Sequence, residues 1–243
     1  MSAPKISIVI PAYNESAVIE QAISAVRAQD YPNFEVVVVN NASTDDTGEK
    51  AARAGARVVY EGNKGLIQAR SAGYKATDSP FIANMDADCI PPPDWLTRSM
   101  KYFASPEIVA VTGGYYLYDL PFLARELGKW WIKLVHRNLS HYLQWRKRGA
   151  YMLGGNVILR RSALDSIGGY NLSLRFWGED IDTAIRLSTI GKVFMTSDTF
   201  IPSSGRRLRE NGYLKTMRTY FASDRAVFER YAKFLEEFRK GSK

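Results

Sequence analysis

The stretch ISIVIPAYNE at residues 6–15, followed by FEVVVVNN at 34–41, decides the fold. Each contains a short run of apolar, mostly β-branched residues, which is typical of a buried strand. A helix is expected between them, capped by Asn14 or Ser16 and ending near Gln29. Two buried strands joined by a helix predict a right-handed βαβ unit in a parallel sheet.

The alternation of strands and helices continues and then changes. Further strands are predicted at 56–60 and 80–85, and further helices at 44–54 and 65–76. Three prolines after Asp88 break this rhythm. The later elements are expected as helices at 95–103, 120–148, 180–189 and 213–239, and as strands at 108–118, 151–160 and 192–196. The first half is therefore typical of a nucleotide-binding α/β fold, with an insertion and an acceptor side after it.

The composition fits an ordinary globular protein. The chain has 243 residues, of which 46% are hydrophobic and 24% charged, so a sizeable core can form. Its one cysteine, Cys89, excludes a disulfide within the chain. The N-terminus lacks the residue order of a signal peptide, and no apolar run reaches membrane-spanning length. We expect a cytoplasmic protein.

Two acidic residues follow the strand predicted at 80–85. Asp86 and Asp88, separated by Ala87, would lie at the carboxyl end of that strand, where open α/β sheets bind ligands. Carboxylates two residues apart can reach one Mg²⁺ or Mn²⁺ ion together with phosphate oxygens. The alternative is a pair that only caps the next loop.

Polar residues also follow the first two strands and begin the third helix. Asn14 and Glu15 come after the first strand, and Asn40 after the second. Lys64 and Arg70 could meet phosphate or base near a helix N-terminus. Capping is the alternative for each of them. The chain has neither a Gly-x-Gly-x-x-Gly after a strand nor a Walker loop, which weakens dinucleotide and P-loop interpretations.

The segment FWGEDID at 176–182 starts a predicted helix with acidic residues. They would suit the helix dipole, or Asp180 would act as a general base toward a hydroxyl group. In the second case Trp177 would form a wall that stacks on a sugar. Gly154 and Gly155 would form a floor without side chains.

Six segments together resemble the family 2 inverting glycosyltransferases. They are VIPAYNE at 9–15, VVNNASTDDT at 38–47, NKGLIQARSAG at 63–73, MDADC at 85–89, GGNVILRRSALDSIGGYN at 154–171 and FWGEDIDTAIRL at 176–187. Their order matches the family over residues 5–200. The resemblance implies a three-layer α/β/α GT-A fold with a mostly parallel central sheet.

The resemblance also implies roles for individual residues. Asp180, with Glu179 beside it, would be the catalytic base, and Asp88 and Asp86 would bind the divalent cation. Gly154, Gly155 and Trp177 are assigned to the acceptor. The donor, a nucleotide-diphosphate sugar, is assigned to Pro11, Tyr13, Asn14, Glu15, Asn40, Lys64, Arg70, Asp86, Ala87 and Arg206. The expected reaction is a one-step displacement with inversion at the anomeric carbon.

Two departures from the family pattern affect the donor site. Asn40 stands where the family commonly has aspartate, and its amide can still pair with uracil, although guanine shows a similar edge. Residues 201–205 lack the histidine that many relatives use as a metal ligand, and His136 and His141 are left out of the metal site. A loop at 203–211, with Arg206, is expected to close on the diphosphate, or to be a solvated basic loop.

The segment 120–148 combines aromatic and basic residues at helical spacing. Seven of its residues are basic and one is acidic between 125 and 148, which accounts for +6 of the net charge of +8. Its apolar face either packs on the domain or attaches the protein to an anionic membrane leaflet that holds a lipid-linked acceptor. No recognition motif supports nucleic-acid binding.

We therefore expect one glycosyltransferase domain that adds a single sugar to a glycan or lipid-linked acceptor. Its parts are a nucleotide-sugar half at 5–118, the insertion at 119–149, an acceptor half at 150–212 and a C-terminal helix at 213–243. The processive Gln-x-x-Arg-Trp motif is absent, as is the glycine-rich loop of nucleotidyltransferases. A catalytically silent module that binds nucleotide-sugar or polysaccharide is the alternative.

Overall fold

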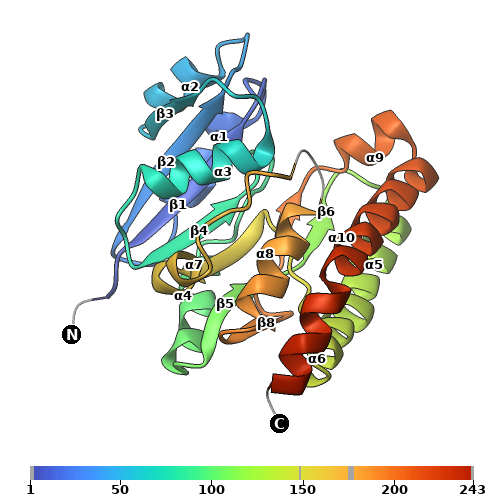
Figure 1. Cartoon of the computed structure of the whole chain (residues 1–243). Coiled ribbons are helices and arrows are strands. Elements are labelled where there is room, and N and C mark those ends of the chain that lie inside the picture. The colour runs from blue at the N-terminus through green and yellow to red at the C-terminus, as the bar shows by residue number, and fades with distance from the viewer. Residues whose placement is uncertain (1–2, 148, 175–177, 242–243) are drawn as a thin grey trace.

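A central sheet of seven strands runs through the computed structural model, which describes residues 3–147, 149–174 and 178–241 (Figure 1). Its strands are β1 (Ile6–Ala12), β2 (Phe34–Asn41), β3 (Arg57–Glu61), β4 (Phe81–Met85), β5 (Ile108–Thr112), β7 (Asn156–Arg160) and β8 (Lys192–Met195). Their order across the sheet is β3-β2-β1-β4-β7-β5-β8. β7 runs antiparallel between β4 and β5, and every other neighbouring pair is parallel. The mostly parallel sheet is confirmed.

Helices cover both faces of this sheet. One face carries α1 (Ile19–Arg27), α2 (Thr47–Arg53) and α4 (Trp95–Met100), which a short 3-10 helix, η1 (Lys101–Ala104), extends. The other carries α3 (Leu66–Lys75), α7 (Arg161–Ser166) and α8 (Glu179–Leu187). Successive strand residues alternate between the two cores, as strand geometry requires. The predicted three-layer α/β/α GT-A architecture is confirmed.

The segment predicted as one strand at 108–118 forms two strands, because the chain leaves the main sheet after β5, at Gly113 and Gly114. Beyond them, β6 (Tyr115–Leu117) pairs with β9 (Ile201–Ser203) in a separate parallel sheet. A Cβ atom at Gly113 would lie 2.0 Å from the Thr199 carbonyl oxygen, so only glycine allows this close crossing. The strand predicted at 151–160 begins only at Asn156.

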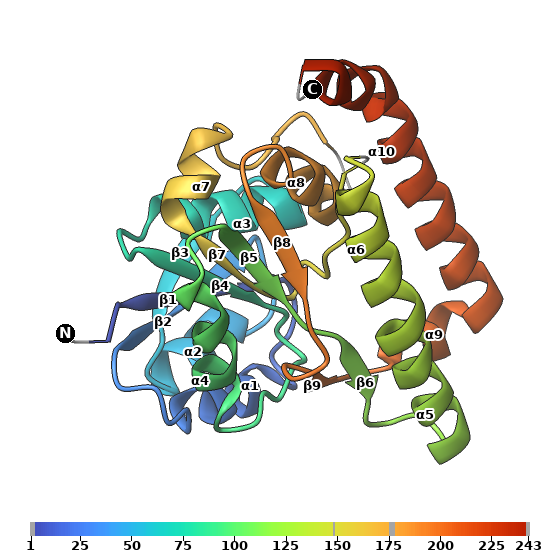
Figure 2. The ribbon, with the colours of Figure 1, turned by 90° about the horizontal axis from the view of Figure 1, so that it is seen from below.

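Long helices form an outer layer beside the domain. The predicted helix at 120–148 is observed as α5 (Phe122–Trp131), a π-helical turn η2 (Ile132–His136) and α6 (Arg137–Trp145). Figure 2 shows α5, α6 and α10 (Tyr213–Gly241) along one side, with α9 (Arg206–Asn211) at the start of α10. In the described part of the chain, no helix has the length and apolar character that crossing a membrane requires.

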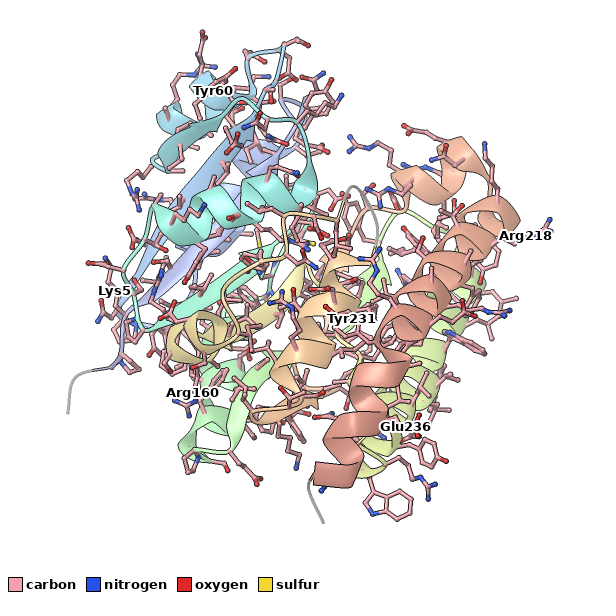
Figure 3. All side chains as sticks on the ribbon, in the orientation of Figure 1. Lys5, Tyr60, Arg160, Arg218, Tyr231 and Glu236 are labelled. Carbon is pink, nitrogen blue, oxygen red and sulfur yellow. The ribbon has the colours of Figure 1, made fainter. Side chains whose placement is uncertain are left out.

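α10 attaches to the domain through α8. Ile181 and Ile185 of α8 pack against Val227 and Leu235 of α10. Tyr231 donates a hydrogen bond to Asp182 at 2.5 Å, and Figure 3 shows it on the side of α10 that faces α8. This helix therefore lies directly behind the predicted catalytic segment.

Two further predictions about helices were wrong. Neither Asn14 nor Ser16 caps α1, because that helix begins at Ile19 after Val18. The segment predicted as a loop at 203–211 consists of the end of β9 and the helix α9. α9, like α7, has only six residues. Such a helix is too short to show a clear apolar period in the sequence.

Candidate active site

The residues after β1 and β2 form one edge of the site. Asn14 has a φ of 52°, a left-handed conformation that asparagine tolerates better than most residues. Its side-chain oxygen accepts a hydrogen bond from the Thr44 backbone N–H at 2.8 Å, and its Nδ2 donates to Thr44 Oγ1 at 3.2 Å. Asn14 therefore ties the two strand-end loops together.

Asn40 lies inside the second of these loops. Its Oδ1 accepts a hydrogen bond from the Ser43 backbone N–H at 3.2 Å. A Cβ atom at Gly48 would lie 2.6 Å from Asn40 Nδ2, so the amide rests against α2. The side chain is half-buried at the carboxyl edge of the sheet, where a base could approach it.

Asn41, to which the sequence analysis gave no role, positions the next loop. Its buried Nδ2 donates to the carbonyl oxygens of Glu61 and Asn63, and its Oδ1 accepts from the Gly65 N–H at 2.7 Å. The loop thus held presents Lys64, whose Nζ lies 3.6 Å from the centre of the Tyr13 ring. Two predicted donor residues therefore meet. Pro11, a third, is buried within β1.

Asp86 and Asp88 lie at the end of β4, as predicted, with Ala87 buried between them. Asp86 accepts a hydrogen bond from Tyr115 of β6 at 3.5 Å, and Asp88 accepts one from Ser203 of β9 at 3.3 Å. The small β6–β9 sheet therefore contacts both carboxylates. Neither partner could be found from the sequence, because each is distant along the chain and has no motif of its own.

The charge around Asp88 fits a cation. Burial and the negative charges of Asp86 and Glu15 raise the pKa of Asp88 to about 6, against the opposing effect of Arg206. A divalent ion would relieve this repulsion, and carboxylate oxygens are ligands that Mg²⁺ and Mn²⁺ accept. Within the described ranges, no three such side chains converge on one point. Donor phosphates and water would have to complete the coordination.

Arg70 joins this carboxylate pair to the predicted catalytic segment. It is buried, and its guanidinium donates to Glu179 at 2.8 Å and to Asp86 at 3.4 Å. Burial alone would lower the pKa of Arg70, but Glu179 and Asp86 outweigh it and raise the pKa. Residues separated by about half the chain therefore share one ion network, in which Arg70 and Glu179 are buried and the Asp86 side chain is 39% exposed.

Gly154 and Gly155 make this network possible. A Cβ atom at Gly154 would lie 2.5 Å from Arg70 Nη1, and one at Gly155 would lie 2.0 Å from Asp86 Oδ2. Their place in the structure is thus against the donor-side residues, whereas the sequence analysis assigned them to the acceptor. Trp177, the other residue assigned to the acceptor, lies outside the described residues.

Asp180 stands at the start of α8, after Gly178 in a left-handed conformation. One of its oxygens accepts from the Ile181 N–H at 2.9 Å. Burial, then the charge of Glu179 and more weakly that of Asp224, raise its pKa to about 7, while Arg70 acts in the opposite direction. A carboxylate that titrates near neutrality suits a general base.

Arg206 reaches across the site from α9. Its Nη2 contacts both carboxylate oxygens of Glu15, at 2.6 and 2.9 Å. Arg209 on the same helix pairs with Asp119 at 2.9 Å, and Arg207 donates to Tyr220 at 3.3 Å. Against the effect of burial, Tyr220 and then the charges of Asp86 and Asp88 raise the pKa of Arg207.

Comparison with known proteins places this arrangement in a family. The family described as Glycosyl transferase family 2 matches residues 7–168. The chain belongs to this family. It is similar to an uncharacterized glycosyltransferase of Haemophilus influenzae (30% identity, 47% of this chain, 37% of the relative) and to glycosyltransferase AglE of Haloferax volcanii (31%, 45%, 39%). The match thus spans well under half the length of each relative.

Solved structures share the fold of this family 2 chain. The mannosyltransferase PcManGT of Pyrobaculum calidifontis, in complex with GDP-Man and Mn²⁺, superposes with a TM-score of 0.65 at 22% identity, over 84% of this chain and 59% of that one. Glucosyl-3-phosphoglycerate synthase of Mycobacterium tuberculosis, with Mn²⁺, UDP and phosphoglyceric acid, gives 0.67 at 23% identity, over 93% and 79%.

Proposed function

We propose that this family 2 protein is an inverting glycosyltransferase that moves one sugar from a UDP-sugar to a hydroxyl group of a lipid-linked or cell-surface glycan. The observation that carries the proposal is the Glu179–Arg70–Asp86 network. It joins Glu179, the residue before the base candidate Asp180, to Asp86 of a carboxylate pair suited to a cation. A merely structural pair of caps would not need this connection through the buried Arg70.

In the proposed reaction, the acceptor oxygen bonds to the anomeric carbon from the side opposite the diphosphate. The bond from that carbon to the phosphate oxygen breaks, and the nucleoside diphosphate leaves. Asp180 accepts the acceptor proton in this step. Its pKa of about 7 means that much of it is ionised at neutral pH and that it holds a proton well once it has gained one.

Asp86 and Asp88 are the residues proposed to hold Mn²⁺ or Mg²⁺. A bound divalent cation would stabilise the charge that develops on the leaving diphosphate. Lys64 and Arg206 supply further positive charge at this edge of the sheet. Arg206 can exchange Glu15 for a phosphate, since guanidinium forms charge-assisted hydrogen bonds with both carboxylate and phosphate groups.

Asn40 supports uracil as the donor base. Its amide oxygen can accept from the uracil N3–H, as a carboxylate also could, and its NH₂ can donate to O4, which a carboxylate cannot. Guanine presents a similar edge and is the alternative. Isothermal titration with UDP, GDP and dTDP tests this directly. Binding of UDP alone agrees with the proposal, whereas tight binding of GDP without UDP would exclude a uracil donor.

A screen of nucleotide-sugars with Mn²⁺, reading released nucleoside diphosphate, tests the transferase proposal. Release that depends on an added glycan or lipid-linked acceptor agrees with it. The alternative, a catalytically silent module that binds nucleotide-sugar or polysaccharide, predicts binding by titration and no release with any donor or acceptor.

A further inference from the structure

The insertion formed by α5, η2 and α6 presents its large apolar side chains outward. None of the residues in α5 and η2 is buried, and Trp130 and Trp131 are 54% and 50% exposed. The exposed set consists of Phe122, Leu123, Leu127, Trp130, Trp131, Leu134, Val135, Leu139, Tyr142 and Trp145. A contiguous apolar surface of this kind marks an interaction site. We call this set the insertion face.

Polar contacts attach the opposite side of the insertion to the domain. The His136 ring lies 4.8 Å from the Tyr151 ring, Ser140 Oγ donates to the Tyr151 carbonyl oxygen at 2.9 Å, and Gln144 Nε2 donates to the Val193 carbonyl oxygen at 2.7 Å. These three residues recur every fourth position, so they lie on one line along the helix. With this attachment, the side chains of the insertion face are between 36% and 74% exposed, so the sheet domain does not fully cover them.

Basic side chains of the insertion lie near aromatic rings, three of which belong to the insertion face and one, Tyr116, to β6. Four cations each lie within 6 Å of a ring centre: Arg125 near Phe122 at 5.3 Å, Lys129 near Tyr116 at 5.9 Å, Lys133 near Trp130 at 5.5 Å and Arg146 near Trp145 at 5.7 Å. Trp and Tyr beside Lys and Arg are the side chains that suit a membrane–water boundary, because each combines an apolar body with a polar tip.

We propose that the insertion face docks on the surface of an anionic lipid bilayer. Its apolar side chains would enter the boundary between head groups and acyl chains, and its lysines and arginines would face the anionic head groups. A second copy of this chain is a poorer occupant, because a twofold interface would bring the same basic segment against itself. The proposal goes beyond the transfer reaction and does not depend on it.

The start of the insertion lies next to the predicted donor residues. Asp119, just before α5, accepts hydrogen bonds from Ser204 Oγ at 2.7 Å and from the Gly205 N–H at 2.5 Å, and it pairs with Arg209. Arg206, the residue after Gly205, contacts Glu15. Docking through the insertion face would therefore hold the site close to an acceptor carried by the same bilayer.

Co-sedimentation of the full chain with vesicles tests the proposal. One vesicle is phosphatidylcholine alone, and the other contains equal parts of phosphatidylcholine and phosphatidylglycerol. We expect binding to the mixed vesicle that is lost at high salt, and little binding to the neutral one. Equal binding to both vesicles, or no binding to either, would overturn the proposal.

Two pairs of variants separate the contribution of the insertion's lysines to vesicle binding from that of positive charges elsewhere on the protein. Lys129→Gln/Lys133→Gln should weaken binding to the mixed vesicle by roughly 25-fold, about fivefold for each lysine. The matched control, Arg53→Gln/Lys75→Gln, removes two positive charges from exposed positions on α2 and α3. It should change binding by less than about twofold, because these charges contribute only a small part of the long-range attraction to the vesicle. Equal losses in both pairs would show only non-specific attraction.

Trp130→Ser/Trp131→Ser should abolish vesicle binding, whereas Tyr60→Ser, an exposed aromatic on β3 far from α10 in Figure 3, should not. Thermal unfolding followed by circular dichroism shows whether each variant is folded. If the wild type is a dimer that Trp130→Ser/Trp131→Ser dissociates, a second copy covers this face and the proposal is wrong. A failure to find any nucleotide-sugar substrate would leave these vesicle results unaffected.

Discussion

The β1–β4 region and the insertion both contain regularly spaced apolar residues, but these are buried in the first and exposed in the second. In β1 and β2 the apolar side chains are buried between two layers of helices. In α5 and η2 none of the residues is buried, and hydrogen bonds from Ser140 and Gln144 of α6 attach the insertion to the domain. Periodicity therefore tells which residues share a face, but the contacts made elsewhere decide what covers that face.

Among the variants that contrast the two regions, the largest expected effect falls on the carboxylate pair. Asp88→Asn should lower transfer roughly 10²- to 10³-fold, because it removes a charge aimed at the cation and diphosphate. Steady-state release of nucleoside diphosphate measures it. Asp78→Asn, at an exposed carboxylate after α3, is the matched control and should change nothing. Vesicle binding should be the same in both, and unchanged transfer in Asp88→Asn would argue against a cation there.

Truncation of a leucine should change the free energy of unfolding by different amounts in the two regions. Leu159→Ala, in the buried middle of β7, should lower the free energy of unfolding by about 2–5 kcal/mol. Leu134→Ala, on the insertion face, should lower it by about 0.5 kcal/mol or less. Urea titration followed by circular dichroism gives both values. A large loss in Leu134→Ala would mean that the insertion face is packed in solution.

Two glycines give a smaller contrast. Gly155→Ala places a methyl group where Asp86 lies, so transfer should fall roughly 10- to 100-fold as the carboxylate is displaced. Gly128→Ala, on α5, meets no atom within 4 Å and should leave transfer unchanged while stabilising the helix by about 0.5–1 kcal/mol. Nucleotide release and thermal unfolding of the two variants test this pair. Equal activity would mean that Asp86 moves without consequence.

The smallest effect concerns pH. Asp180 must be ionised to accept a proton, so transfer should rise with pH through about 7 and level off above it. Asp224→Asn removes a negative charge that raises the pKa of Asp180, so the rising limb should move to lower pH. Glu229→Gln, also on α10, should leave the limb in place. If the rising part of the pH–rate profile stays at the same pH in Asp224→Asn, the charge of Asp224 on α10 does not act on Asp180.

Much of the fold and the outline of the site could be predicted from sequence. The strand-end motifs were sufficient because a parallel sheet gathers its carboxyl ends at one edge, as Asn14, Asn40 and Asp86 show. The partners of these residues could not be predicted. Tyr115, Ser203 and Asp224 reach the site from β6, β9 and α10, and only tertiary packing determines that.

The insertion shows the other limit of the sequence. Its amphipathic pattern was recognised, but whether the apolar face turned inward or outward depended on where His136, Ser140 and Gln144 found partners. Those partners are Tyr151, in the segment before β7, and Val193, in β8, and neither is a sequence neighbour of the residue that it contacts. The sequence alone therefore did not determine which way the apolar face of the helix points.

The most direct test of the central claim, that Asp180 is the base beside a donor site held by other residues, is Asp180→Asn. Its transfer rate and its affinity for UDP would be measured on the same preparation. We predict that transfer falls by roughly 10³-fold or more while UDP affinity stays within about twofold, since the amide cannot accept the proton. Transfer close to that of the wild type, at any pH, would contradict the claim.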